Sequence, residues 1–208
     1  MPLDVLQRGI VWAMKENLNI QMVYPHYQLP KEYRDTIETI DHTKIGPSES
    51  GEQLDVTVLT DLVKADGPQT YLWQCTLDEL QRQQEAVANV VSHVRRLNVV
   101  LTDVPQWKEQ QFADYKEVLD GLADHLLDLY VRGKAPQLNI LTDRLILQQM
   151  NNCGAGDTSV TLAPDGRFYV CPAFYPGTSV GSLAEGLAVP NQQLYKVDHA
   201  PICRACDA

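Results

Sequence analysis

The sequence predicts an α/β protein whose parallel β-sheet is either open or part of a (β/α) barrel. Two observations support this fold class: short apolar segments ending in Leu-Thr-Asp recur along the chain, and the stretches between them have the periodicity of amphipathic helices. The three segments are VTVLTD at 56–61, NVVLTD at 98–103 and NILTD at 139–143. Their threonines lie 42 and then 40 residues apart. Short continuous apolar runs of this kind are typical of parallel strands that are buried on both faces.

The stretches between these strands predict helices that cover the sheet. In 76–97, Thr76 and Glu79 have the spacing of a capping box. The apolar residues of this stretch keep to one face of a helix: Leu77, Leu80, Val87, Val90, Val91 and Val94. A second amphipathic stretch, 106–132, ends at Gly133, a residue that commonly follows the last turn of a helix.

Two more strands are predicted at 19–25 and 70–76, which gives about five strands alternating with helices. The segment GPSESGEQ at 46–53 predicts a surface loop. A helix is predicted at the N-terminus, with an apolar face made of Leu3, Leu6, Ile10 and Met14. Because a parallel α/β fold normally begins with a strand, we expect sequence upstream of this helix to be missing or lost.

The composition limits the partners of the protein. The net charge of −10 and the pI near 4.8 argue against nucleic-acid binding, which needs clustered Lys and Arg. The nearest basic cluster, Arg95-Arg96, is assigned to the end of a helix. Apolar runs are too short to cross a membrane, and the N-terminal segment has neither a basic start nor a cleavage site, so we expect no signal peptide. With an odd number of cysteines as well, the sequence predicts a cytoplasmic protein.

Near residue 150 the helical periodicity ends and turn-forming residues become frequent. We therefore expect an α/β domain at 1–150 and a separate C-terminal region at 151–208. In this region, DTSVTLAPDGRFYVCP predicts a β-hairpin with a Pro-Asp-Gly turn. Pro164 presets one backbone dihedral of the turn, and Gly166 accepts a positive φ that other residues resist.

Four of the five cysteines lie in the C-terminal region: Cys153, Cys171, Cys203 and Cys206. The hairpin is expected to bring Cys153 and Cys171 together at its two feet, and the C-x-x-C pair at 203–206 can grip one metal ion. Since thiolates select zinc and iron–sulfur sites, we expect these four residues to be ligands. Cys75 lies in a predicted strand, and we interpret it as a small core residue.

The Thr-Asp pairs allow two interpretations. Asp61, Asp103 and Asp143 are expected at the carboxyl ends of strands, where parallel sheets bind ligands, so they are candidate substrate-binding residues. Thr and Asp are also ordinary helix caps, and capping is the preferred interpretation. No phosphate-binding loop and no nucleophile with a neighbouring base is evident, so the catalytic residues stay unassigned.

The cysteine spacing carries a resemblance. The spacing resembles the opening of the SPASM motif, which follows many radical SAM peptide-modifying barrels. Twelve residues separate Cys153 from Gly166, four separate Gly166 from Cys171, and the pair Cys203-x-x-Cys206 comes later. In that family the first pair helps to bind one auxiliary iron–sulfur cluster, and the later C-x-x-C starts the ligand set of another. The sequence ends two residues after Cys206, so we do not expect it to complete two four-iron clusters by itself.

A closer resemblance covers nearly the whole chain. The CXXX repeat peptide maturases are similar to this protein in the segments VWAMKENLNIQMVYP, LNVVLTDV, KAPQLNILTDR, MNNCGAGDTSVTLAPDGRFYVCPAFYP and PICRACDA. This resemblance implies a (β/α) barrel-like body and, as substrate, a cysteine-rich precursor peptide made by the ribosome. The chain has no C-x-x-x-C-x-x-C, so no S-adenosylmethionine site is evident, and a partner modification protein is a further candidate partner.

Three hypotheses follow. In the first, the protein is a peptide-modifying maturase without its own radical SAM site, and its C-terminal cysteines bind a 4Fe–4S cluster. In the second, it is a non-catalytic peptide-binding module in which the same four cysteines form a structural zinc site. In the third, the C-terminal tail is truncated and the cysteines are unligated. Metal analysis and thiol titration separate the three.

Overall fold

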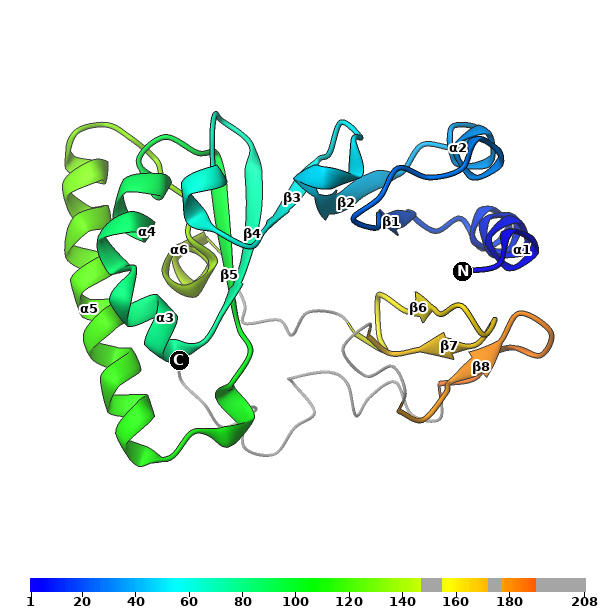
Figure 1. The fold of residues 1–208 in the computed structure, drawn as a ribbon. Helices are drawn as coiled ribbons and strands as arrows, with labels where there is room; N and C mark the ends of the chain where they lie inside the picture. The colour runs from blue at the N-terminus through cyan, green and yellow to red at the C-terminus, as the bar shows by residue number, and fades with distance from the viewer. Residues whose placement is uncertain (147–154, 172–176, 190–208) are drawn as a thin grey trace. The chain divides into compact units, whose positions relative to one another are not determined.

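The computed structural model describes residues 1–146, 155–171 and 177–189 (Figure 1). The chain divides into two compact units. The larger unit consists of Gln21–Lys31 and Asp41–Leu147 and holds a parallel sheet with its helices. The smaller unit combines Met1–Ile20 and Glu32–Ile40 with the C-terminal part of the chain. The domain boundary expected at residue 150 falls outside the described residues and stays a prediction.

The larger unit contains a five-stranded sheet in which every neighbouring pair is parallel and the strands follow chain order. The strands are β1 (Gln21–Val23), β2 (Thr43–Pro47), β3 (Val56–Leu59), β4 (Thr70–Cys75) and β5 (Arg96–Leu101). In the part of the chain that is described, β1 and β5 are the two edges and do not pair with each other. The α/β class is therefore confirmed, and the sheet is open rather than a closed barrel.

Helices lie beside β4 and β5, the last two strands of the sheet (Figure 1). Helices α3 (Leu77–Arg82) and α4 (Gln84–Val91) connect β4 to β5, and the long helix α5 (Glu109–Val131) packs against both of them. Helix α6 (Asn139–Ile146) contacts β5 and α5. Helix α2 (Lys31–Ile37) lies between β1 and β2 in the chain but, apart from Lys31, belongs to the smaller unit. Among its described residues, the larger unit also has three short 3₁₀ helices: η1 (Ser48–Ser50), η2 (Leu62–Lys64) and η3 (Val104–Gln106).

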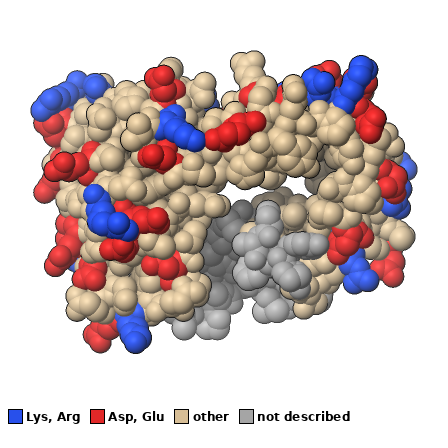
Figure 2. All heavy atoms as spheres, viewed as in Figure 1, with Lys and Arg blue, Asp and Glu red and all other residues tan. Residues whose placement is uncertain are grey.

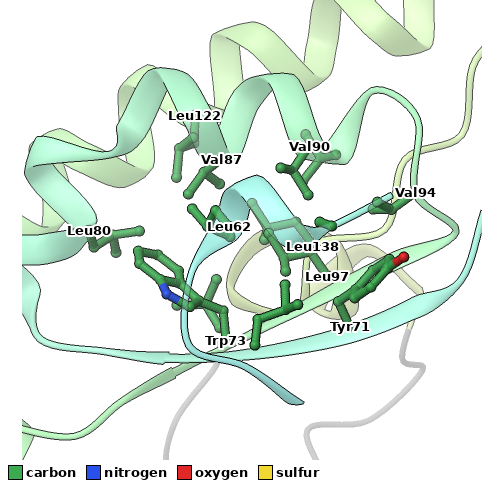
Figure 3. Packing of buried hydrophobic residues seen from close by; sticks show 14 of the residues in the cluster. Leu62, Tyr71, Trp73, Leu80, Val87, Val90, Val94, Leu97, Leu122 and Leu138 are labelled. Carbon is green, nitrogen blue, oxygen red and sulfur yellow. The ribbon is translucent and has the colours of Figure 1, made fainter. Parts of the chain in front are cut away.

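The core lies on one face of this sheet. Because side chains alternate along a strand, Tyr71, Trp73 and Cys75 of β4 point to the same face, and all three are at most 3% exposed. Leucine and valine side chains from the covering elements meet them there (Figure 3). The residues on the opposite face of β4, Leu72 and Gln74 among them, are half-buried or exposed.

The helix predicted at 76–97 is present but shorter than expected. Its capping box is confirmed, since the Glu79 N–H donates to Thr76 Oγ1 over 3.3 Å and the Thr76 N–H donates to Glu79 Oε2 over 2.8 Å. The helix is interrupted at Gln83 and ends at Val91. The assignment of Arg96 to a helix end is wrong, because this residue begins β5 and pairs in register with Thr70.

The strand predicted at 139–143 is wrong. Only Leu138 forms a β-bridge, with Leu97, and the chain then turns into α6. Thr142 stabilises this turn, because its hydroxyl accepts from the Leu138 N–H over 2.9 Å and donates to the Leu138 carbonyl over 3.0 Å. Ile140 and Leu141 pack against the core from a helix instead of a strand.

The fifth strand of the sheet comes from a segment that sequence analysis left out. Strand β2 ends with Gly46 and Pro47, which were expected to begin a surface loop and are buried. Gly46 is required there because an added Cβ would lie 2.9 Å from Cβ of Tyr24. The strands predicted at 19–25, 56–61, 70–76 and 98–103 are confirmed as β1, β3, β4 and β5.

The described part of the smaller unit contains helix α1 (Leu3–Lys15), nearly all of α2 and short antiparallel strands. Trp12 of α1 lies against Phe168, with ring centroids 4.4 Å apart. Leu6 and Ile10 are buried as the apolar pattern predicts, whereas Met14 is 63% exposed. The antiparallel pairs are β6 (Thr161–Leu162) with β7 (Phe168–Tyr169) and β8 (Gly181–Ser182) with β9 (Gly186–Leu187).

Candidate functional site

The hairpin expected around Gly166 is present as β6 and β7. Thr161 lies opposite Tyr169, and Leu162 lies opposite Phe168. Gly166 has a φ of 77° and donates its N–H to the Ala163 carbonyl over 3.0 Å, which closes the turn. The positive φ is the reason that a glycine is needed at this position.

Asp165 holds the turn together. Its carboxylate accepts a hydrogen bond from the Arg167 N–H over 3.0 Å and another from the Tyr169 hydroxyl over 2.8 Å. The bond from the Arg167 N–H is the main reason that the pKa of Asp165 lies below its ordinary value. An ionised aspartate therefore links the turn to β7.

Cys171 follows β7 by two residues and is the one proposed metal ligand that the structure describes. Its thiol is free and half-buried. Strand β7 is paired with β6 and also makes a backbone hydrogen bond to a later segment, because the Val180 N–H donates to the Phe168 carbonyl over 2.8 Å. Phe168 itself is 1% exposed, so Cys171 extends from a well-packed strand. Cys153, Cys203 and Cys206 lie outside the described residues.

Cys75 has a different environment. It is the last residue of β4 and is 2% exposed, which confirms its interpretation as a core residue. Burial raises the pKa of the Cys75 thiol to about 12, and the nearby carboxylates of Glu79 and Asp103 add to this rise. A thiol of this kind stays protonated at neutral pH and is neither a nucleophile nor a ready metal ligand.

Within residues 1–146, 155–171 and 177–189, no three His, Cys, Asp or Glu side chains are grouped so that they could hold a metal ion. Three of the four cysteines of the proposed site fall outside these ranges, so this absence does not bear on that site. A free thiol at the foot of a hairpin fits a thiolate ligand of zinc or of an iron–sulfur cluster. The metal site stays a prediction.

Asp61 and Asp103 lie just after the carboxyl ends of β3 and β5, and both act as caps. Asp61 is exposed, and its carboxylate accepts from the Val63 N–H over 3.1 Å at the start of η2. Asp103 is half-buried, and both of its oxygens lie 3.2 Å from the N–H of Leu77, the first residue of α3. Asp103 therefore caps the helix that follows the neighbouring strand.

Asp143 does not join the other two aspartates. It lies in α6, and its carboxylate forms a bidentate ion pair with Arg96, with N–O distances of 2.9 and 2.7 Å. Arg96 is the first residue of β5, whereas Asp103 follows the other end of that strand. The expectation that all three aspartates lie at the carboxyl ends of strands is wrong for Asp143, because its segment folds as a helix.

Sequence analysis missed the polar network around Arg96. The guanidinium donates from Nε to Asn98 Oδ1 over 2.8 Å in addition to its pair with Asp143. Asn98 in turn donates to the Tyr71 carbonyl over 3.3 Å. These side chains lie on the face of the sheet opposite the core. The available signal was the alternation of apolar and other residues in RLNVVL, where Arg96, Asn98 and Val100 share one face. Sequence analysis instead assigned Arg96 to the end of a helix and treated the rest as an apolar run.

An aromatic cluster lies beyond the carboxyl end of β5. The ring centroid of Trp107 is 5.3 Å from that of Phe112 and 5.3 Å from that of Tyr115. Burial raises the pKa of Tyr115, and the nearby Cys75 adds to this rise. The cluster therefore packs the start of α5 against the region of Cys75.

The surface carries mixed charges. On the face shown in Figure 2, basic side chains are scattered among acidic ones and form no continuous basic patch. In the described ranges, no helix combines the length and the apolar character that membrane crossing requires. No family model, no curated protein and no solved structure matches this chain.

Proposed function

We propose that this protein acts in the cytoplasm in the maturation of a cysteine-rich CXXX repeat peptide, and that Cys153, Cys171, Cys203 and Cys206 bind an iron–sulfur cluster. The proposal starts from the resemblance to the CXXX repeat peptide maturases and from the cysteine spacing. The observation that supports it best is the contrast between Cys171 and Cys75. Cys171 is a free, half-buried thiol beside a hairpin, whereas Cys75 is fully buried in the core.

The hairpin gives the proposed site a rigid base. The Asp165 carboxylate ties the turn to β7, and the Val180 N–H ties β7 to the chain beyond it. A ligand at position 171 is therefore held in a defined direction from the strand, as a cluster requires. When bound, a cluster supplies one-electron redox chemistry, and the peptide is expected to bind beside it.

The first experiment is metal analysis of the full protein purified without oxygen. We expect brown material that contains iron and acid-labile sulfide. The Cys171→Ser variant should lose most of its iron, whereas the matched Cys75→Ser variant should keep it. Colourless protein without iron after reconstitution under reducing conditions would contradict the cluster, and one zinc ion per chain would favour the structural zinc site instead.

The second experiment tests the peptide. A synthetic peptide with cysteine at every fourth position is titrated into the purified protein, and binding is followed by calorimetry. The control peptide carries serine at each of those positions. We expect the cysteine peptide to bind and the serine peptide to bind at least tenfold more weakly, which corresponds to about 1.4 kcal/mol. Equal binding of the two peptides, or binding of neither, would contradict the proposed substrate.

A further inference from the structure

The two edges of the parallel sheet are closed in different ways. Strand β1 has three residues and is followed by Tyr24 and Pro25, and short strands next to a proline offer little backbone for pairing. Strand β5 has six residues, RLNVVL, without proline. A strand of this length and composition is a template for pairing with another chain unless its edge is covered.

The backbone groups of β5 alternate between its two sides. Arg96 and Thr102 donate their N–H groups toward the β4 side, to the carbonyls of Gln69 and Cys75. Leu97, Val99 and Leu101 therefore turn their N–H and carbonyl groups toward the outer edge. The Leu97 N–H donates to the Gln137 carbonyl over 2.9 Å, so the first of the three is paired with backbone.

At the second outward position a side chain replaces the backbone. The Val99 N–H donates to Asn139 Oδ1 over 2.8 Å, and Asn139 Nδ2 donates to the Val99 carbonyl over 3.0 Å. The carboxamide of Asn139 thus offers one acceptor and one donor, as a peptide group of a neighbouring strand would. The backbone leaves the sheet at this point, because α6 begins at Asn139 and Thr142 fixes its first turn.

We propose that the Asn139 side chain is an edge cap that ends the sheet at β5 and prevents β5 from pairing with β5 of a second copy of this chain. Pairing needs a row of open backbone groups on alternate residues. With Leu97 bound to the 137–138 segment and Val99 bound to Asn139, only Leu101 is left without an outer partner in the described part of the chain. One position is too few for a ladder.

The test is the association state of the Asn139→Ala variant of the full chain. Analytical ultracentrifugation over a range of concentrations is expected to show a weight-average mass that rises with concentration toward twice the wild-type value. Removal of the amide also removes two hydrogen bonds, so a control must separate association from loss of stability. Val87→Ala serves this purpose because it leaves a cavity in the core but removes neither of the Asn139 hydrogen bonds.

The outcomes are distinct. We expect Val87→Ala, and Asn89→Ala on an exposed part of α4, to sediment like the wild-type protein. The edge cap is refuted if Asn139→Ala also sediments like the wild type at every concentration. It is equally refuted if Val87→Ala associates as strongly as Asn139→Ala, because association would then follow from loss of stability alone.

Discussion

Replacement of Asp103 by alanine tests whether this carboxylate is a structural cap. Both oxygens lie 3.2 Å from the Leu77 N–H, at the start of α3. Loss of a capping side chain typically costs about 0.5–2 kcal/mol. Asp103 is half-buried and bridges two connections of the sheet, so we expect a cost of about 1–2 kcal/mol, in the upper part of that range. For a chain of this size, each kcal/mol lowers Tm by about 2–4 °C, which gives a decrease of about 2–8 °C.

The assay is thermal unfolding followed by circular dichroism at neutral pH. Asp61→Ala is the matched control, because Asp61 also caps a helix after a strand but is exposed and makes one bond of 3.1 Å. We expect this control to cost about 0.5 kcal/mol, at the lower end of that range. The Asp103→Asn variant keeps one acceptor oxygen, so its Tm should lie between those of the wild type and Asp103→Ala.

Two results would refute this reasoning. The first is an unchanged Tm for Asp103→Ala. The second is a larger loss for Asp61→Ala than for Asp103→Ala, since the exposed cap would then matter more than the half-buried one. If Asp103→Asn abolished peptide binding without a change in Tm, Asp103 would be a binding residue, as the alternative interpretation of the Thr-Asp pairs holds.

Two further predictions concern the core thiol and the ion pair. Because folding raises the pKa of Cys75 from 9.0 to about 12, the unfolded chain loses its thiol proton first, so this residue lowers stability as pH rises from about 9 to 12. Urea unfolding of Cys75→Ala across that range should show a smaller alkaline loss than the wild type, and an identical slope would contradict the raised pKa. Arg96→Lys breaks the bidentate contact with Asp143, and we expect a loss of about 0.5–1 kcal/mol in urea unfolding because the pair is about one-third exposed. A double-mutant cycle with Asp143→Asn checks this, and a coupling energy of zero would show that the pair is incidental.

The strands predicted correctly share a physical feature. β3, β4 and β5 each contain an apolar run, but only alternate residues of each strand are buried, because the covering helices pack on one face of the sheet rather than on both. Strand β2 was not predicted, because TKIGP contains lysine, glycine and proline. Its strand conformation depends on parallel pairing with β1 and β3. Local propensity does not report such pairing.

The segment at 139–143 shows the opposite failure. NILTD and NVVLTD look alike, but their surroundings differ. The Asn139 amide and the Thr142 hydroxyl replace backbone hydrogen bonds that a strand would have made, so the chain leaves the sheet after Leu138. A sequence pattern cannot show which of two equivalent ways of satisfying buried backbone groups is used.

For the candidate site, the sequence distinguished the roles of the cysteines only in part. It identified Cys75 as a core residue, which the structure confirms, and it named Cys171 as a ligand, which stays a prediction. It also listed three aspartates as equivalent. The structure separates them into two caps and one partner of Arg96.

The sequence by itself determined the α/β class, the capping box at Thr76, the long helix that ends before Gly133 and the glycine-dependent turn at Gly166. These features depend on residues close together in the chain, where apolar periodicity and backbone preference act directly. Only the tertiary structure decided that the sheet is open, that β2 is its fifth strand and that Asn139 ends it. Those features depend on hydrogen bonds between segments up to about 40 residues apart, whose partners are chosen by packing rather than by local sequence.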